Sequence, residues 1–225
     1  MKKRVSKGRQ NNQTEDTTNT RMRLLEAAGQ LFAEKGFDRT TSKEITELAG
    51  ANVASVNYHF QGIEGLYAAV VEEASGLLVT SAQMQEAMQG HQDPNNKLEA
   101  FLRMFVRSLT SPASSSWKLR ILAREFSSPT LCNQPLHKKE RMQKVSILKG
   151  IVAEITGLPE EHPAVARSCI NVLAPCFFLM IGDRPTIKKA FPKLGLNPKD
   201  AEDLVQHMLH YAQAGLAIIA AKANE

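Results

Sequence analysis

The chain has 225 residues, of which 43% are hydrophobic, enough for one large domain or for a small domain followed by a larger one. The formal net charge is +5, and the excess lies in the first ten residues, where Lys2, Lys3, Arg4, Lys7 and Arg9 occur without an acid. The three cysteines lack metal-ligand spacing, which argues against a disulfide framework and favours buried thiols in a reducing, cytoplasmic setting.

Residues 1–19 consist of this basic arm and a polar stretch with little apolar surface. We expect disorder until a polyanion is bound, because so little burial cannot offset the entropy of ordering. An ordinary solubilising tail has the same composition and stays an alternative. No apolar segment of a signal peptide follows the lysines. The longest apolar run, residues 172–181, is about half the length that spans a bilayer, so we expect no membrane partner.

Two helices are predicted next. The first starts at Thr20, has apolar residues at three-and-four spacing, and ends before Gly36. Thr41 and Glu44 have the spacing of a capping box, which predicts the start of the second helix. Gly50 ends it.

A third helix follows after a very short turn, with Asn52 as its cap, so the two helices should cross steeply. Val56 and Phe60 are predicted to face inward, which leaves an outward face without charge. Such a face suits the major groove of DNA, where Asn pairs with adenine, small apolar groups meet thymine methyls, and hydroxyls or rings reach phosphates. The candidate DNA-binding residues are Thr41, Ser42, Val53, Ala54, Ser55, Asn57, Tyr58 and His59. A small helical subdomain in which Tyr58 and His59 pack on the next helix is the alternative.

Residues 24–67 resemble the N-terminal DNA-binding domain of the TetR family of transcriptional repressors. The matching residues, in order, are Ala27, Ala28, Leu31, Phe32, Gly36, Phe37, Thr40, Thr41, Ile45, Ala49, Gly50, Tyr58, His59, Phe60, Leu66 and Tyr67. The chain differs from the family pattern at Asn57, where a Tyr is common, and at Ile63, where a phosphate-binding Lys is usual. Residues 121–130 resemble the subgroup typified by the CecR and CerR regulators.

This resemblance implies an all-α fold of about nine helices: a helix-turn-helix domain at residues 20–65 and an effector-binding and dimerisation domain at residues 66–225. It also implies repression of a double-stranded DNA operator that a small molecule relieves.

The remaining helices are predicted from breakers and apolar spacing at residues 64–88, from Pro94 with Asp93 as its cap, and at residues 117–126, 135–156, 163–181 and 198–221. Residues 163–181 are apolar on nearly every side, which predicts burial on every side. One side would pack on its own domain and the other on a second subunit, as in a four-helix bundle of a homodimer. The candidate dimer residues are Cys169, Leu173, Met208, Ala212, Gly215 and Leu216. Packing within one chain is the alternative.

An effector cavity is predicted among the middle helices. Its candidate residues are Met104, Phe105, Trp117, Arg124, Phe126 and Phe178. Each of them could instead be core or surface, and no ligand class or cofactor follows from the sequence.

Enzyme motifs are not found: the sequence has no Gly-rich phosphate loop, HExxH motif or nucleophile elbow. His207 and His210 are three residues apart but make an incomplete metal site, so we expect polar surface residues and no metal. A helical protein-docking adaptor, and then a metal-dependent all-α enzyme, remain the alternatives to a DNA-binding regulator.

Overall fold

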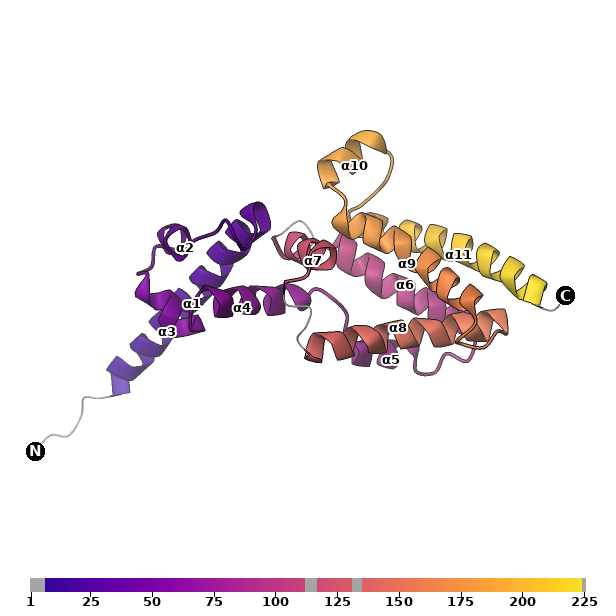
Figure 1. Cartoon of the computed structure of the whole chain (residues 1–225), viewed down its shortest axis with the longest axis horizontal. Coiled ribbons are helices and arrows are strands. Elements are labelled where there is room, and N and C mark those ends of the chain that lie inside the picture. The colour runs from indigo at the N-terminus through magenta and orange to yellow at the C-terminus, as the bar shows by residue number, and fades with distance from the viewer. Residues whose placement is uncertain (1–6, 112–116, 131–134, 224–225) are drawn as a thin grey trace, which may run out of the picture. The chain divides into compact units, whose positions relative to one another are not determined.

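The computed structural model describes residues 7–111, 117–130 and 135–223, with side chains for all of these except residues 7–16 and 135–138. Every regular element in the described residues is helical, as the sequence predicts (Figure 1). The chain divides into two compact units, Met1–Ser75 and Gly76–Glu225.

The first unit contains α1 (Lys7–Lys35), α2 (Ser42–Ala49), α3 (Ala54–Phe60) and α4 (Ile63–Ser75). Residues 1–19 were expected to be disordered without a polyanion; α1 begins at Lys7, and residues 1–6 lie outside the described residues. Thr20 is not a cap, and its hydroxyl accepts a hydrogen bond from Arg23 at 3.3 Å. Residues 7–19 contain no proline, so a helix nucleated by the apolar turns further on can extend back through them.

Aromatic packing joins α4 to the first unit. The Phe32 and Tyr67 rings meet edge to face at 4.9 Å between centroids, and Phe37 lies 5.0 Å from Tyr67. Leu66 and Val70 of α4 are fully buried. Because α4 packs on α1 and α3, the first unit ends at Ser75, ten residues beyond the expected boundary at 65.

The single helix expected at residues 64–88 is two helices. α4 ends at Ser75, and α5 (Ser81–Met88) begins after a capping box formed by Thr80 and Gln83. The Gln83 side chain accepts from the Thr80 N–H at 2.9 Å, and the Thr80 hydroxyl accepts from the Gln83 N–H at 3.2 Å. These bonds satisfy backbone groups that a continuous helix would have paired internally.

The second unit contains α5 and six further α-helices in the described residues. They are α6 (Pro94–Thr110), α7 (Trp117–Ser127), α8 (Pro135–Thr156), α9 (Pro163–Ile181), α10 (Arg184–Ala190) and α11 (Ala201–Ala223), with a short 3-10 turn at Pro198–Asp200. Asp93 caps α6 as predicted, accepting from the Asn95 N–H at 2.9 Å. The sequence did not predict α10, which Asp183 caps and which stands away from the other helices of the unit (Figure 1).

The core of the second unit is formed mainly by α6, α8, α9 and α11. By length and composition alone α9 could cross a membrane. Its buried residues Val165, Val172 and Leu179 instead lie in this core. Only one side of α9 is buried in a single chain, because Ile170 and Phe178 on the other side are exposed. Cys169 and Cys176 are buried thiols as expected, and Cys132 lies outside the described residues.

Gly65 offers a test of how closely α4 meets α3. A Cβ at this position would lie 1.8 Å from the Phe60 carbonyl oxygen, which is backbone and cannot swing aside. We expect Gly65→Ala to destabilise the first unit by about 1 to 3 kcal/mol, the usual cost of overpacking. Thermal unfolding followed by far-UV ellipticity measures this loss.

Gly150→Ala is the matched control, because its Cβ would make only an ordinary contact, 3.8 Å from a Glu160 oxygen. It should leave stability unchanged or raise it by about 0.5 to 1 kcal/mol, as expected for Ala in a helix interior. Fluorescence of Trp117, the single tryptophan, reports the second unit separately. Unfolding of Gly65→Ala at the wild-type temperature would contradict the close approach.

Candidate nucleic-acid interface

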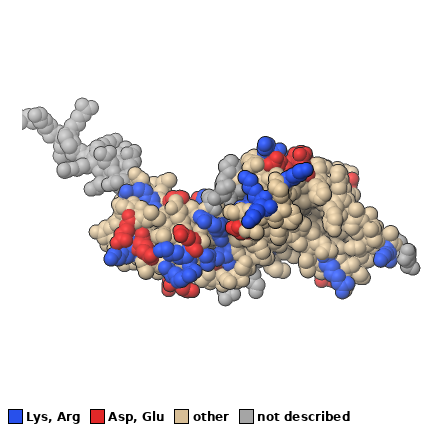
Figure 2. Space-filling model, turned by 90° about the horizontal axis from the view of Figure 1, so that it is seen from above, with Lys and Arg blue, Asp and Glu red and all other residues tan. Residues whose placement is uncertain are grey.

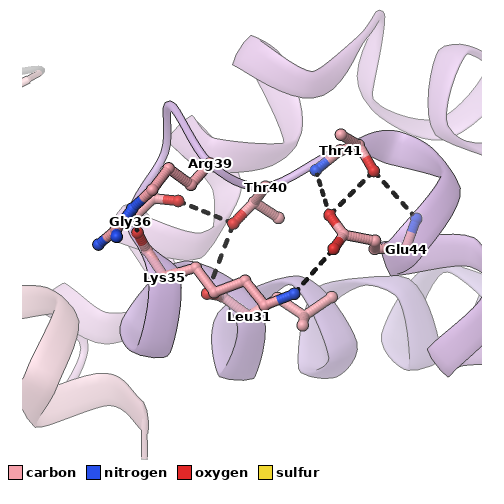
Figure 3. Close-up of polar contacts among 7 residues, drawn as sticks. All are labelled: Leu31, Lys35, Gly36, Arg39, Thr40, Thr41 and Glu44. Carbon is pink, nitrogen blue, oxygen red and sulfur yellow. Dashed lines mark hydrogen bonds and ion pairs between the residues drawn. The ribbon is translucent and has the colours of Figure 1, made fainter.

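A network of hydrogen bonds fixes the start of α2 (Figure 3). The Glu44 carboxylate accepts from the Thr41 N–H and from the Thr41 hydroxyl, each at 2.9 Å, and the same hydroxyl accepts from the Glu44 N–H at 3.3 Å. This is the predicted capping box. The Thr41 hydroxyl therefore already donates to Glu44. The Ser42 hydroxyl could bond a phosphate without first losing such a bond.

The same network ties α2 to the end of α1. Lys35 donates to the second Glu44 oxygen at 2.7 Å. Thr40 is buried and donates to the Gly36 carbonyl at 2.7 Å, and Arg39 donates to the Lys35 carbonyl at 3.0 Å (Figure 3). Lys35, Arg39 and Thr40 thus hold the connection between the two helices, a role the sequence analysis did not assign to them.

Glu44 is an acid whose charge is well compensated. Hydrogen bonding to Lys35 first, and then to Thr41, lowers the pKa of Glu44 from an ordinary 4.5 to about 2. Hydrogen bonding to Glu44 likewise raises the pKa of Lys35. The carboxylate therefore stays ionised at neutral pH without presenting an unpaired negative charge beside the turn.

The turn into α3 is as short as the sequence predicts. Gly50 has φ +58°, the left-handed conformation of a helix C-terminus, and the Ala51 N–H donates to the Thr46 carbonyl at 2.9 Å. The Asn52 side chain accepts from the Ala54 N–H at 2.9 Å, as expected of a capping residue, although Val53 is the residue directly before α3. Only four residues separate α2 from α3, as in a helix-turn-helix motif.

α3 turns two residues inward and most of the others outward. Val56 and Phe60 are buried, as predicted. Val53, Ala54, Asn57 and Tyr58 are exposed, with Tyr58 at 77% of its full area, and Ser55 and His59 are half-buried. The outer face of α3 has no Lys, Arg, Asp or Glu and presents an amide, a phenol and small apolar groups. These are groups that read base edges and phosphates.

The end of α3 is fixed by a left-handed turn. Gln61 has φ +62°, and its N–H donates to the Asn57 carbonyl at 3.0 Å. Gly62 has φ +120°, and Ile63 then begins α4, half-buried. The first turn of α4 carries Glu64 and no cation, so it offers no charged side chain to a phosphate.

Two protein families match the chain. Residues 24–70 match "Bacterial regulatory proteins, tetR family", and residues 94–219, more than half of the chain, match the C-terminal domain of the HTH-type transcriptional dual regulator CecR. The chain belongs to the TetR family. Both the family and the CecR-like subgroup agree with the resemblance seen in the sequence.

Similar proteins agree with this assignment. The chain is 41% identical over 54 residues to the probable HTH-type transcriptional regulator YttP of Bacillus subtilis (strain 168), and 39% identical over 56 residues to the HTH-type regulator YvkB of the same organism. These matches span 24% and 25% of this chain and only 26% and 30% of the two relatives.

Solved structures of TetR-like regulators share the fold over most of the chain. HlyIIR, a hemolysin II transcriptional regulator, has a TM-score of 0.56 at 21% identity, covering 87% of this chain and 97% of its own. AibR, solved with isovaleryl coenzyme A and operator DNA, has a TM-score of 0.61 at 18% identity, covering 83% and 96%. At such identities the likeness establishes the fold.

Of the predicted effector residues in this TetR-family chain, Phe105 lines an apolar hollow in the second unit, and the other five are not among the residues that line it. Trp117 is buried, and Met104 and Arg124 are half-buried. Phe126 is 48% exposed, and its ring stacks on Phe177 at 4.4 Å. Phe178 is 51% exposed, whereas Phe177, the preceding residue, lines the hollow.

Of the predicted dimer residues, Cys169, Met208 and Leu216 are buried in the core of a single chain. Leu173 and Ala212 are half-buried, and Gly215 is exposed. A helix that is apolar on every side gives no sequence signal for which side faces its own core.

The lowered pKa of Glu44 predicts how its contribution to the stability of the fold depends on pH. Because its folded-state pKa is depressed, its stabilising effect is complete above an ordinary pKa of 4.5 and is lost as the pH falls through about 2. We expect Glu44→Ala to unfold at lower urea concentration than wild type at neutral pH, and the difference to shrink between pH 4.5 and 2. Urea unfolding followed by far-UV ellipticity measures it.

Glu44→Gln separates the contribution of the capping hydrogen bond from that of the ion pair with Lys35. Its amide oxygen can still accept from the Thr41 N–H, but the uncharged side chain forms no ion pair. It should destabilise less than Glu44→Ala at neutral pH. A Glu44→Ala difference that stays constant over the acid range would contradict the lowered pKa.

Proposed function

We propose that this chain is a sequence-specific transcriptional repressor that binds a palindromic DNA operator as a dimer and is released by a small molecule. The observation that carries the proposal is the outer face of α3, which is exposed, uncharged and held rigidly by Val56 and Phe60. A solvated helix usually has charge on its outer face. An amide and a phenol among small apolar groups instead suit the edges of bases. AibR, a structural relative, was solved with both operator DNA and a small molecule.

The distribution of charge suggests that different segments attract DNA and discriminate among bases. Between residues 17 and 75 the chain has five Lys and Arg against eight Asp and Glu, so this part is not attracted to a polyanion by net charge. The five cations of the first nine residues are the available source of that attraction. We assign long-range attraction to this segment and base discrimination to α3.

An apolar outer surface on α9 and α11 supports the dimer. Ile170 is 65% exposed, Tyr211 78% and Ile218 60%. The two helices pack on each other, and small Ala214 and Gly215 leave space for close approach to another helix. Seen from above in Figure 2, the second unit has a broad area without Lys, Arg, Asp or Glu beside its charged α10 region. Exposed apolar surface of this kind marks a protein interface.

A dimer can recognise a longer DNA sequence than one α3 helix can recognise alone. α3 has seven residues and can touch few base pairs, and each mismatch costs about 1 to 3 kcal/mol. Two copies related by twofold symmetry read two half-sites about 34 to 36 Å apart, or a multiple of that. A ligand that changes this spacing lowers DNA affinity without touching DNA.

Substitutions on α3 test base reading. The purified protein is footprinted on the DNA that flanks its own gene, and the protected duplex and a scrambled duplex are then titrated. Asn57→Ala should lower the preference for the protected duplex by about tenfold, the cost of one lost bidentate base contact. Tyr58→Ala should weaken binding to both duplexes, as expected for a phosphate contact.

Glu72→Gln is the control, because Glu72 is exposed near the C-terminal end of α4 and away from α3 in sequence. It should leave the preference unchanged, and all three proteins should melt at similar temperatures. Protein docking instead of DNA binding would show as weak binding to both duplexes with little dependence on salt. The assignment of α3 as the base-reading helix would be refuted if Asn57→Ala kept the wild-type preference for the protected duplex and Tyr58→Ala bound both duplexes as wild type does.

Sedimentation tests the dimer. The wild-type chain should sediment as a dimer at micromolar concentration, and Ile218→Asp should weaken association by about tenfold or more, because it places a charge in an apolar interface. Met142→Asp is the control, since Met142 is equally exposed, at 59%, but lies on α8. A monomeric wild type, or dissociation of both variants alike, would contradict this interface.

A further inference from the structure

Arg21 of α1 is a cation beside the C-terminal end of α3. Its guanidinium carbon lies 5.1 Å from the centre of the Phe60 ring, and Phe60 is the last residue of α3. Arg21 comes one turn before Leu24, which is fully buried, on the side of α1 that faces the core. Arg21 itself is exposed, so it lies at the rim where the core of the first unit meets solvent. α1 passes beside α3 in this unit (Figure 1).

The positive charge of Arg21 is not paired with an acid in the described part of the chain. None of the described carboxylates lies within ion-pair distance of its guanidinium. The contact with an aromatic face orients the cation without cancelling its charge. By contrast, Lys35 pairs with Glu44 at 2.7 Å. Lys43 pairs with Glu47 at 3.9 Å. The Arg21 guanidinium can therefore pair with an anion from outside the chain without first losing a partner.

The remaining cations of the first unit have other surroundings. Arg39 donates to the carbonyl of Lys35, at the other end of α1 and roughly 20 Å from Arg21 by helical rise. Arg23 has its Nη1 3.8 Å from the position that a Cβ on Gly50 would take, beside the C-terminus of α2, where a cation stabilises the helix dipole. The first turn of α4 has no cation. Of the described cations, it is therefore Arg21 that contacts the end of α3.

The end of α3 that Arg21 contacts also carries Asn57. Asn57 and Phe60 are three residues apart and so are neighbours on the surface of the helix. The Asn57 side-chain oxygen lies 3.9 Å from the position that a Cβ on Gly62 would take, just beyond this end. α3 has seven residues and is about 10 Å long, comparable with the major groove, which is about 12 Å wide. With Asn57 on a base edge, a cation at this end of α3 is within reach of the groove wall, which phosphates form.

We propose that Arg21 binds a backbone phosphate of the operator beside the base pair that Asn57 contacts, and that the Phe60 ring holds the guanidinium in place for this contact. The inference rests on the proposed function, in which α3 reads the operator. Arg suits this role because its planar guanidinium stacks on a ring face and still directs N–H groups at phosphate oxygens. The contact positions α3 on the duplex but carries no sequence information, since every nucleotide presents the same phosphate.

Titration of the full chain with the protected and the scrambled duplex, at several salt concentrations, tests this contact. Arg21→Gln should bind both duplexes about tenfold more weakly, the usual effect of one lost hydrogen bond to a charged group, and should keep its preference between them. The steepness of log affinity against log salt should fall by about 0.9, because one phosphate fewer is neutralised. Arg21→Lys should keep the steepness, since it keeps the charge. It should lose part of the affinity, since an ammonium has no planar face to stack on Phe60.

Lys188→Gln is the matched control, because it makes the same change in net charge at an exposed cation of α10, in the second unit. It should keep the wild-type affinity and salt dependence, and all the variants should melt like wild type. Wild-type affinity or an unchanged salt dependence in Arg21→Gln, a lost preference between the duplexes, or an equal effect of Lys188→Gln would each overturn the role of Arg21 while operator binding by the wild type stands. A wild type that does not prefer the protected duplex would refute the proposed function as well.

Discussion

The burial of Val56 and Phe60 is the constraint on which the DNA-binding unit depends. α3 has seven residues, well below the roughly 12 to 15 at which an isolated helix becomes stable in water, so tertiary contacts must hold it. The two buried side chains fix its rotation, Asn52 caps its start, and the backbone of Phe60 is packed directly against Gly65. A face that is fixed in this way can present Asn57 and Tyr58 in the same geometry in every molecule, which specific recognition requires.

The attraction to DNA and the discrimination among bases that we propose belong to different parts of the sequence. α3 carries no formal charge, and the charged side chains near the turn are largely committed to each other, as the bond between Lys35 and Glu44 shows. The basic residues at the N-terminus lead into α1, which is helical from Lys7. A salt-dependent, sequence-independent contribution and a neutral, sequence-dependent one can therefore vary independently.

Features whose cause lies within a few residues could be predicted from the sequence. The caps at Thr41, Asn52 and Asp93 were predicted correctly, because each depends on one side chain and the next turn of backbone. The break between α4 and α5 had an equally local signal, the capping box at Thr80, which continuing apolar periodicity obscured. Contacts between distant residues had no local signal in the sequence. The bond from Arg184 to the Leu109 carbonyl joins residues 75 apart and exists only once α10 lies against the end of α6.

α9 shows why the candidate sites of the second unit could not be placed from sequence. Its apolar residues cover every side, so periodicity does not orient it, and one step along the helix separates Phe177 in the hollow from exposed Phe178. The same helix lines the hollow with Cys176 and presents Ile170 on its outer side. The two sides of α9 therefore have different surroundings within one chain, and the packing of the helix, not its apolar pattern, distinguishes them.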